Sequence, residues 1–191
     1  MFSIQRSTGG GRSPLDEFFL SFKGFQYDSS LHPSKSWKSL KFFKGWMGKD
    51  AKGKEEGRKS RKGKRSDKKE SREENDARLR YMRALEDDVR AWFGEADDIE
   101  SCHAVCRALG IKDLPSTPKG CASKLRNTHV NIVDLLQWVR QGQKDKVKIF
   151  KSYDSLRRYT VDSEKFFPQS SVEEEGETNI VLRHLLRRFF R

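Results

Sequence analysis

Five cysteine and histidine side chains in the middle of the chain have the donor atoms that zinc uses in proteins. They are Cys102, His103, Cys106, Cys121 and His129. A zinc finger normally places two residues between paired cysteines, whereas three residues separate Cys102 from Cys106. Both of these cysteines also fall on the apolar face of a predicted helix, where free cysteine packs as a small hydrophobic side chain. We therefore interpret them as core residues, and we predict no metal ligand and no cofactor.

Nucleophilic catalysis is the second chemistry to consider. It needs a cysteine or serine beside a histidine base that a third group orients. Cys121, His129 and Asp134 supply these three types, so an enzyme or enzyme accessory that uses Cys121 and His129 stays open as an alternative function. The favoured role for His129 is packing or helix capping, because accidental combinations of this kind are common.

Acidic pairs and a glycine run complete the candidates for catalysis. The pairs Asp87–Asp88 and Asp97–Asp98 and the run 173–175 are predicted to be solvated, because charge runs usually lie on the surface. The glycine run in STGGGRS lacks the Lys-Ser/Thr ending of a phosphate-binding loop. The sequence thus leans away from an enzyme.

The largest charge feature is the tract KGKEEGRKSRKGKRSDKKESREEN, from Lys52 to Asn75. Between Lys44 and Arg72 there are 13 Lys and Arg against five acidic residues, which gives +8 of the total net charge of +12. Such a segment buries too little apolar surface to fold, and it attracts polyanions by counterion release. We predict a disordered linker whose densest part contacts nucleic acid or an importin. The predicted contact residues are Arg58, Lys59, Arg61, Lys62, Lys64, Arg65, Lys68 and Lys69.

This tract contains no aromatic residue, so any nucleic-acid binding by it is expected to show weak sequence preference and steep salt dependence. A solubilising linker with no dedicated partner is the alternative. The odd number of cysteines favours a reducing compartment, and the basic cluster favours the nucleus over the cytoplasm. A mitochondrial location stays open because Arg6 and Arg12 precede the first acid, although the glycines at 9–11 disfavour the amphipathic helix of a presequence.

Apolar residues at helical spacing predict seven or eight helices and at most one short strand, in KVKIF. Ser13, Thr117 and Ser152 are expected to cap helices, and Pro14 to open one that runs to Lys23. The fold class is therefore mostly α, a compact multi-helix domain with a disordered basic linker. The expected organisation is a disordered terminus (1–13), an N-terminal helical pair (14–47), the linker (48–75) and a helical domain (78–191).

Two helices have a predicted buried face. In the second helix it is formed by Trp37, Leu40, Phe43 and Met47, before a stop at Gly48. In RLRYMRALEDDVRAWFG it is formed by Leu79, Met82, Leu85, Val89 and Trp92. The aromatic helical pair is expected to fold back onto the main domain.

The last predicted helix, TNIVLRHLLRRFFR, has an apolar face lined by arginines. That face is formed by Leu182, Leu185, Leu186, Phe189 and Phe190. Such a helix packs on its own core or docks on a protein partner or an anionic membrane. No transmembrane segment is expected, because no apolar run approaches 18 residues.

Several stretches outside the tract resemble a group of uncharacterised fungal proteins with an F/Y-rich N-terminal helix and a helical domain. These stretches are PLDEFFLSFKGFQYD, LEDDVRAWFG, HVNIVDLLQWVRQG, YTVDSEKFFP and VLRHLLRRFF. The resemblance implies a shared helical fold unit and carries no activity, substrate or cofactor. The chain departs from the group between Met47 and Asn75, where its connection is longer and more basic.

Overall fold

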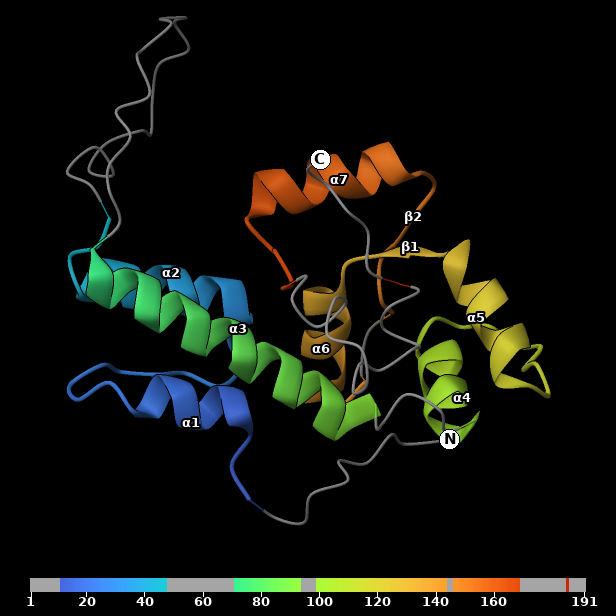
Figure 1. Ribbon diagram of the computed structural model, residues 1–191, viewed down its shortest axis with the longest axis horizontal. Helices are drawn as coiled ribbons and strands as arrows, with labels where there is room; N and C mark the ends of the chain where they lie inside the picture. The colour runs from blue at the N-terminus through green and yellow to red at the C-terminus, as the bar shows by residue number, and fades with distance from the viewer. Residues whose placement is uncertain (1–10, 48–70, 94–98, 144–145, 169–184, 186–191) are drawn as a thin grey trace, which may run out of the picture.

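The computed structural model describes residues 11–47, 71–93, 99–143, 146–168 and 185 (Figure 1). This part of the chain forms seven helices and one two-stranded antiparallel sheet, so the predicted mostly α fold is confirmed. The elements are α1 (Pro14–Leu20), α2 (Pro33–Phe43), α3 (Arg72–Phe93), α4 (Ile99–Ala108), α5 (Pro118–Arg126), β1 (His129–Val130), α6 (Ile132–Arg140), β2 (Ile149–Phe150) and α7 (Tyr153–Ser163).

Local signals position most helix starts. Ser13 and Asp16 form a capping box on α1, Thr117 accepts a hydrogen bond from the Gly120 backbone N–H, and Ser152 caps α7. These caps satisfy backbone N–H groups that have no partner within the helix. The three predicted caps are confirmed, although α1 ends at Leu20 rather than at Lys23.

The long helix α3 is the centre of the fold, and the N-terminal helical pair packs against it (Figure 1). Tyr81 of α3 stacks on Trp37 of α2, with ring centroids 4.9 Å apart and an interplanar angle of 2°. The same tyrosine ring lies 5.7 Å from Phe18 of α1. The pair therefore folds back onto the main domain, as expected, and the two share one hydrophobic core.

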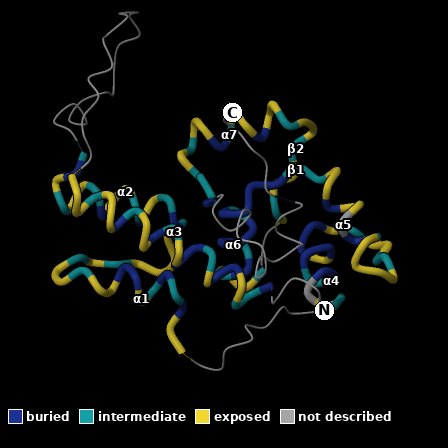
Figure 2. The backbone as a smooth tube through the Cα atoms, in the orientation of Figure 1, coloured by how far each residue is buried: buried dark blue, intermediate teal, exposed yellow. Residues whose placement is uncertain are grey.

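The buried face of α3 matches the predicted one only in part: Leu85 and Val89 are buried as predicted, and Met82 and Trp92 are partly buried against the core. Leu79 is 49% exposed, whereas Tyr81, Ala84 and Asp88 are buried. The reason is that α3 is covered on more than one side, by α1 as well as by α4 and α6. A single stripe read from the sequence misses the additional buried positions of α3, and Figure 2 shows how burial varies along the helix.

Helix α2 ends earlier than predicted. Gly45, at φ 70°, turns the chain back so that the Trp46 N–H bonds the Lys41 carbonyl at 2.9 Å. This is the Schellman arrangement, which needs a left-handed residue after the helix. The turn buries Trp46 and leaves Phe43 49% exposed, so the prediction that Phe43 faces the core is wrong.

Strand β2 forms where KVKIF predicts a strand, and it pairs with β1 through His129 opposite Phe150. Of the final predicted helix, only Leu185 is described, and it is buried in the core. The rest of that helix and residues 48–70 of the predicted linker lie outside the described residues. Residues 72–75, which the sequence analysis assigned to the disordered linker, instead form the first turn of α3, because Ser71 caps the helix start. None of the described helices has the length and apolarity needed to cross a bilayer.

Candidate functional site

The described residues that flank the gap at 48–70, at the end of α2 and the start of α3, contact each other. Lys44, the C-cap of α2, forms an ion pair with Glu73 in the first turn of α3, with its Nζ 2.6 Å from Oε1. Ser71 Oγ accepts the Glu74 backbone N–H at 3.1 Å, which caps the start of α3. The described residues on the two sides of the gap at 48–70 therefore lie at the same end of the folded body (Figure 1).

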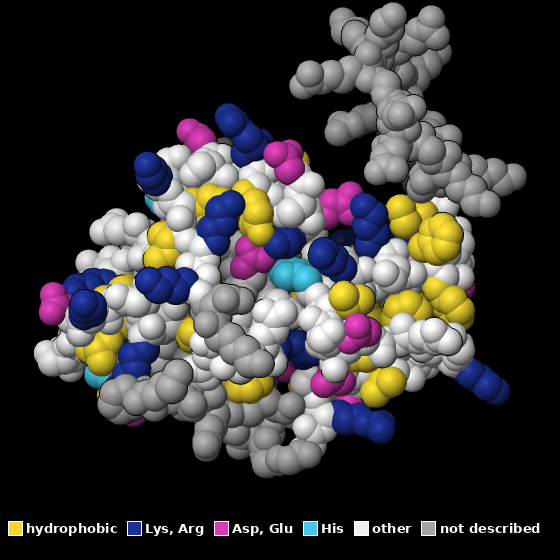
Figure 3. Space-filling model, turned by 180° about the vertical axis from the view of Figure 1, so that it is seen from behind, with side chains coloured by type: hydrophobic (Ala, Val, Ile, Leu, Met, Phe, Trp, Pro, Cys, Tyr) yellow, Lys and Arg dark blue, Asp and Glu magenta, His cyan; other side chains and the backbone are white. Residues whose placement is uncertain are grey.

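The outer face of α2 leads into this point and is both basic and aromatic. Lys35, Lys38 and Phe42 are exposed and lie three and four residues apart, on one side of the helix. Phe42 is 66% exposed, and no acidic residue occurs within α2. Hydrophobic side chains are visible at the end of the molecule where the tract begins (Figure 3). We call Lys35, Lys38 and Phe42 the α2 face.

The predicted polyanion contacts lie in the tract itself. Those residues, Arg58, Lys59, Arg61, Lys62, Lys64, Arg65, Lys68 and Lys69, fall outside the described part of the chain. Sequence reasoning missed the α2 face, because it assigned the phenylalanines of α2 to packing. The lysine spacing without any intervening acid was the feature that pointed to a surface.

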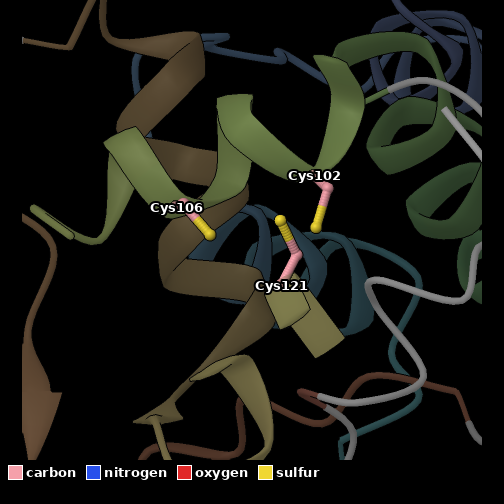
Figure 4. A group of neighbouring side chains, drawn as sticks. All are labelled: Cys102, Cys106 and Cys121. Atoms are coloured by element: carbon pink, nitrogen blue, oxygen red, sulfur yellow. The ribbon is translucent and has the colours of Figure 1, made fainter. Parts of the chain in front are cut away.

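The three cysteines form a buried group between α4 and α5. Their Sγ atoms all lie within 4.8 Å of one another, and Cys102, Cys106 and Cys121 are at most 2% exposed. Cys102 and Cys106 are one turn apart on α4, and Cys121 points toward them from α5 (Figure 4). The predicted burial of Cys102 and Cys106 is confirmed. The sequence did not predict that Cys121 would join them.

The loop before α5 lies close to that helix and positions Cys121. The Pro115 carbonyl accepts hydrogen bonds from His103 Nε2 at 2.8 Å and from Cys121 Sγ at 3.8 Å. A Cβ on Gly120 would lie 2.9 Å from Cβ of Pro115, so only glycine lets the loop lie this close to α5. His103 is thereby directed to a backbone acceptor.

The thiols are poorly suited to nucleophilic attack. Burial raises the pKa of Cys106 to about 11, with the neighbouring Cys121 adding to the effect. Burial also raises the pKa of Cys102. Since the thiolate is the reactive form, thiols with raised pKa values are weak nucleophiles at neutral pH.

The three residues of the catalytic alternative are not connected within the described structure. No hydrogen bond there joins Cys121 to His129, and Asp134 instead accepts from His32 Nε2 at 2.9 Å and from Lys165 Nζ at 2.6 Å. His129 lies in β1, and the cap of α6 is Asn131, which accepts from two backbone N–H groups. His129 therefore does not cap α6.

Arg140 is the centre of a buried polar cluster that the sequence analysis did not predict. Its guanidinium donates to Asp88 Oδ2 at 2.6 Å, to Asp16 Oδ1 at 2.8 Å and to Ser13 Oγ at 2.7 Å. The Tyr27 hydroxyl accepts from it at 2.9 Å and donates to Asp16. We call these five residues the Arg140 cluster. It ties α1 and the following loop to α3 and α6.

Asp88 corrects the prediction that the 87–88 pair is solvated. Asp87 is exposed, but the side chain of Asp88 is 0% exposed. Burial raises the pKa of Asp88, and the attraction of the Arg140 guanidinium offsets this only in part. The net pKa of Asp16 lies below its usual value. Burial alone would raise it, but the hydrogen bonds from Tyr27 and Arg140 have the larger combined effect. These contacts make the Arg140 cluster a structural ion-pair network.

A second polar cluster surrounds Asp134. His32 caps α2 by accepting the Ser34 N–H on Nδ1, so Nε2 carries the proton that it donates to Asp134. Lys165 donates to both Asp134 and the Tyr159 hydroxyl. The net pKa of Asp134 lies below its usual value. Burial alone would raise it, but the hydrogen bonds from His32 and Lys165 have the larger combined effect.

This lowered pKa predicts an acid-dependent loss of stability. The contribution of an ionised Asp134 is present above the unfolded-state pKa of about 3.9 and is lost as the pH falls through the lower folded-state pKa. At pH 7, Asp134→Asn is expected to reduce the free energy of unfolding by about 2 kcal/mol. The difference from wild type should shrink below about pH 4.

Urea unfolding across this pH range measures the effect. The exposed Asp87→Asn substitution is the matched control and should change stability by less than about 0.5 kcal/mol. A difference between wild type and Asp134→Asn that stays constant from neutral to acid pH would contradict the assignment.

Comparison with protein-family models, with curated proteins and with solved structures finds no match to this chain.

Proposed function

We propose that this protein is a non-enzymatic interaction protein that binds single-stranded nucleic acid through its basic tract and the adjoining α2 face. The observation that carries this proposal is the exposed Phe42, which follows Lys35 and Lys38 along one side of α2 at the end of the helix that leads to the basic tract. The tract supplies the charge, and the α2 face supplies the aromatic surface that the tract lacks.

The charge distribution supports the electrostatic part of the proposal. The span from Lys44 to Arg72 has 13 Lys and Arg against five acids. Lys35 and Lys38 extend this positive charge onto a helix without acids. Lys and Arg that neutralise phosphates release condensed counterions, which provides affinity without sequence preference.

The exposed phenylalanines support a single-stranded target. A base stacks on an aromatic ring only when it is not already enclosed in a duplex, and such stacking tolerates any base. Phe42 has the larger exposed fraction, 66%, and Phe43 has 49%. Phe43 also packs on Phe25 at 5.6 Å between ring centroids, which leaves Phe42 as the better platform.

Replacing Phe42 with alanine tests the aromatic part. Stacking of one base is worth about 1–3 kcal/mol, so Phe42→Ala should weaken binding of a labelled oligouridine roughly 5- to 150-fold. Fluorescence anisotropy at fixed salt measures it. The matched control is Val161→Ala, which trims an exposed hydrophobic side chain on α7.

Two outcomes would contradict this proposal. One is equal weakening by Phe42→Ala and Val161→Ala. The other is heparin binding that matches oligouridine binding both in affinity and in its response to Phe42→Ala, since a sulfated polymer has no bases to stack.

The density of Lys and Arg from Arg58 to Lys69 favours a second role, recognition by an importin and hence nuclear location. A fluorescent fusion of the full chain is expected to accumulate in the nucleus. A version with these basic residues changed to serine and glycine should distribute evenly. If both versions distribute alike, the tract does not direct import.

A further inference from the structure

The buried cysteine group has a geometry that packing alone does not require. Three sulfur atoms from two helices converge within 4.8 Å of one another. Cys121 on α5 points toward the pair on α4 (Figure 4). Because Gly120 has no side chain, the loop that contains Pro115 can lie against α5 beside it. We propose that Cys102, Cys106 and Cys121 bind one thiophilic metal ion, of the zinc or copper(I) class.

The spacing of the sulfur atoms fits such an ion. Zinc–sulfur bonds are about 2.3 Å long, so thiolates around a tetrahedral ion are roughly 3.8 Å apart. Sulfur atoms within 4.8 Å of one another need to move inward by about 1 Å at most. Cys102 and Cys106 are one helical turn apart, so both can turn toward an ion held between α4 and α5.

The donor set selects the class of metal. The group has three sulfur donors and, within the described residues, no carboxylate or imidazole joins it. Thiolates favour zinc and copper(I) over magnesium and calcium, which prefer oxygen. Three thiolates complete a trigonal copper(I) site. A zinc ion in the same place has a fourth position to fill.

Binding is a coordination step with proton release. Each of the three thiols loses its proton to solvent as its sulfur bonds the ion, and no electron is transferred. The ion would join α4 to α5 and thereby hold the loop that contains Pro115. This predicts a chain that is more stable with metal than without it.

Metal titration of the full chain tests the proposal. Reduced, metal-free protein is titrated with Co²⁺ as a spectroscopic probe, and then with Zn²⁺ or Cu⁺ as competitors. We expect one equivalent of Co²⁺ per chain with thiolate-to-cobalt charge-transfer absorption. Displacement by Zn²⁺ alone, or by Cu⁺ as well, identifies the preferred ion. Mg²⁺ should displace nothing.

Cysteine variants separate a metal site from a packed core. Cys102→Ala, Cys106→Ala and Cys121→Ala keep an apolar side chain in the core, and each should lower the affinity for Co²⁺ at least tenfold. Circular dichroism checks that each variant is folded. The melting temperature of wild type should rise with Zn²⁺, whereas that of the triple alanine variant should not.

Three results would overturn the proposal. The first is a wild-type protein that shows no thiolate-to-cobalt absorption at any Co²⁺ concentration and no rise in melting temperature with Zn²⁺ or Cu⁺. The second is a set of folded single variants that bind Co²⁺ as tightly as wild type. The third is a two-hydrogen loss in the mass of the protein as isolated, which shows a disulfide between two of these cysteines in place of bound metal.

Discussion

Replacing Arg140 with methionine is expected to lower the free energy of unfolding by about 3–5 kcal/mol. The guanidinium is 7% exposed and its partner Asp88 is 0% exposed, so the substitution leaves a buried carboxylate without its cation. It also removes the hydrogen bonds that Arg140 donates to Ser13 and Asp16. These hydrogen bonds hold α1 against α3 and α6. Urea or thermal unfolding of the full chain measures the loss.

Two further variants make this prediction specific. Arg90→Met removes an exposed arginine from α3 and should cost less than about 0.5 kcal/mol. Combining Arg140→Met with Asp88→Asn removes the uncompensated charge, so the double variant should be more stable than Arg140→Met alone. A cost for Arg140→Met no larger than for Arg90→Met would contradict the assignment of Arg140 as the centre of the cluster.

The stability cost of Arg140→Met is expected to depend on pH, through the pKa of Asp88. Burial raises the folded-state pKa of Asp88, and removing Arg140 takes away the attraction that partly offsets this. When the folded-state pKa of a carboxyl group lies above its unfolded-state pKa, the fold loses stability as the pH rises through these values. The cost of Arg140→Met should therefore be larger at pH 7 than at pH 4.

Changing the eight predicted contact residues of the tract to serine and glycine should weaken binding of oligouridine on the order of 10³-fold at low salt. The changed residues are Arg58, Lys59, Arg61, Lys62, Lys64, Arg65, Lys68 and Lys69. The expected loss is large because each cation that contacts a phosphate releases a counterion, and eight such contacts act together. Filter binding or anisotropy with the full-length variant measures it.

The folded body should be unaffected by these changes. The Lys44–Glu73 ion pair that closes the base of the tract contains none of the altered residues. The melting temperature of the variant should therefore match that of wild type. Unchanged affinity in a variant with an unchanged melting temperature would remove the main support for the tract as a binding element.

Much of the fold was predictable because its signals are local. Ser13, Thr117 and Ser152 each bond a backbone N–H only a few residues away, so the sequence suffices to predict the helix starts. The mostly α class followed from helical spacing of apolar residues. The partner of the KVKIF strand was not predictable, because β1 is two residues long and has no alternation to detect.

The polar clusters were not predictable because they join distant parts of the chain. Asp88 and Arg140 are 52 residues apart, and His32 and Asp134 are 102 apart. One sequence feature did point to Asp88, since it follows Tyr81, Ala84 and Leu85 on the inward face of α3. A charged residue on such a face predicts a buried partner without naming it.

The cysteine group likewise has one part that the sequence predicts and one part that it does not. Helical spacing predicts that Cys102 and Cys106 share a face, and that face is buried. Cys121 joins them only because the loop before α5 folds back against Gly120. That approach depends on tertiary packing, so the sequence interpretation as core residues could not include the convergence of three sulfur atoms.

The salt dependence of oligouridine binding tests the proposed function most directly. If the eight tract cations contact phosphates, the slope of log affinity against log salt concentration should be about −5 to −6 for the full chain. Between 50 and 200 mM salt the affinity should fall by roughly three powers of ten. The variant that lacks the eight charges should give a much shallower slope, set by the remaining cations such as Lys35 and Lys38. Equal slopes for the two proteins would contradict nucleic-acid binding by the tract.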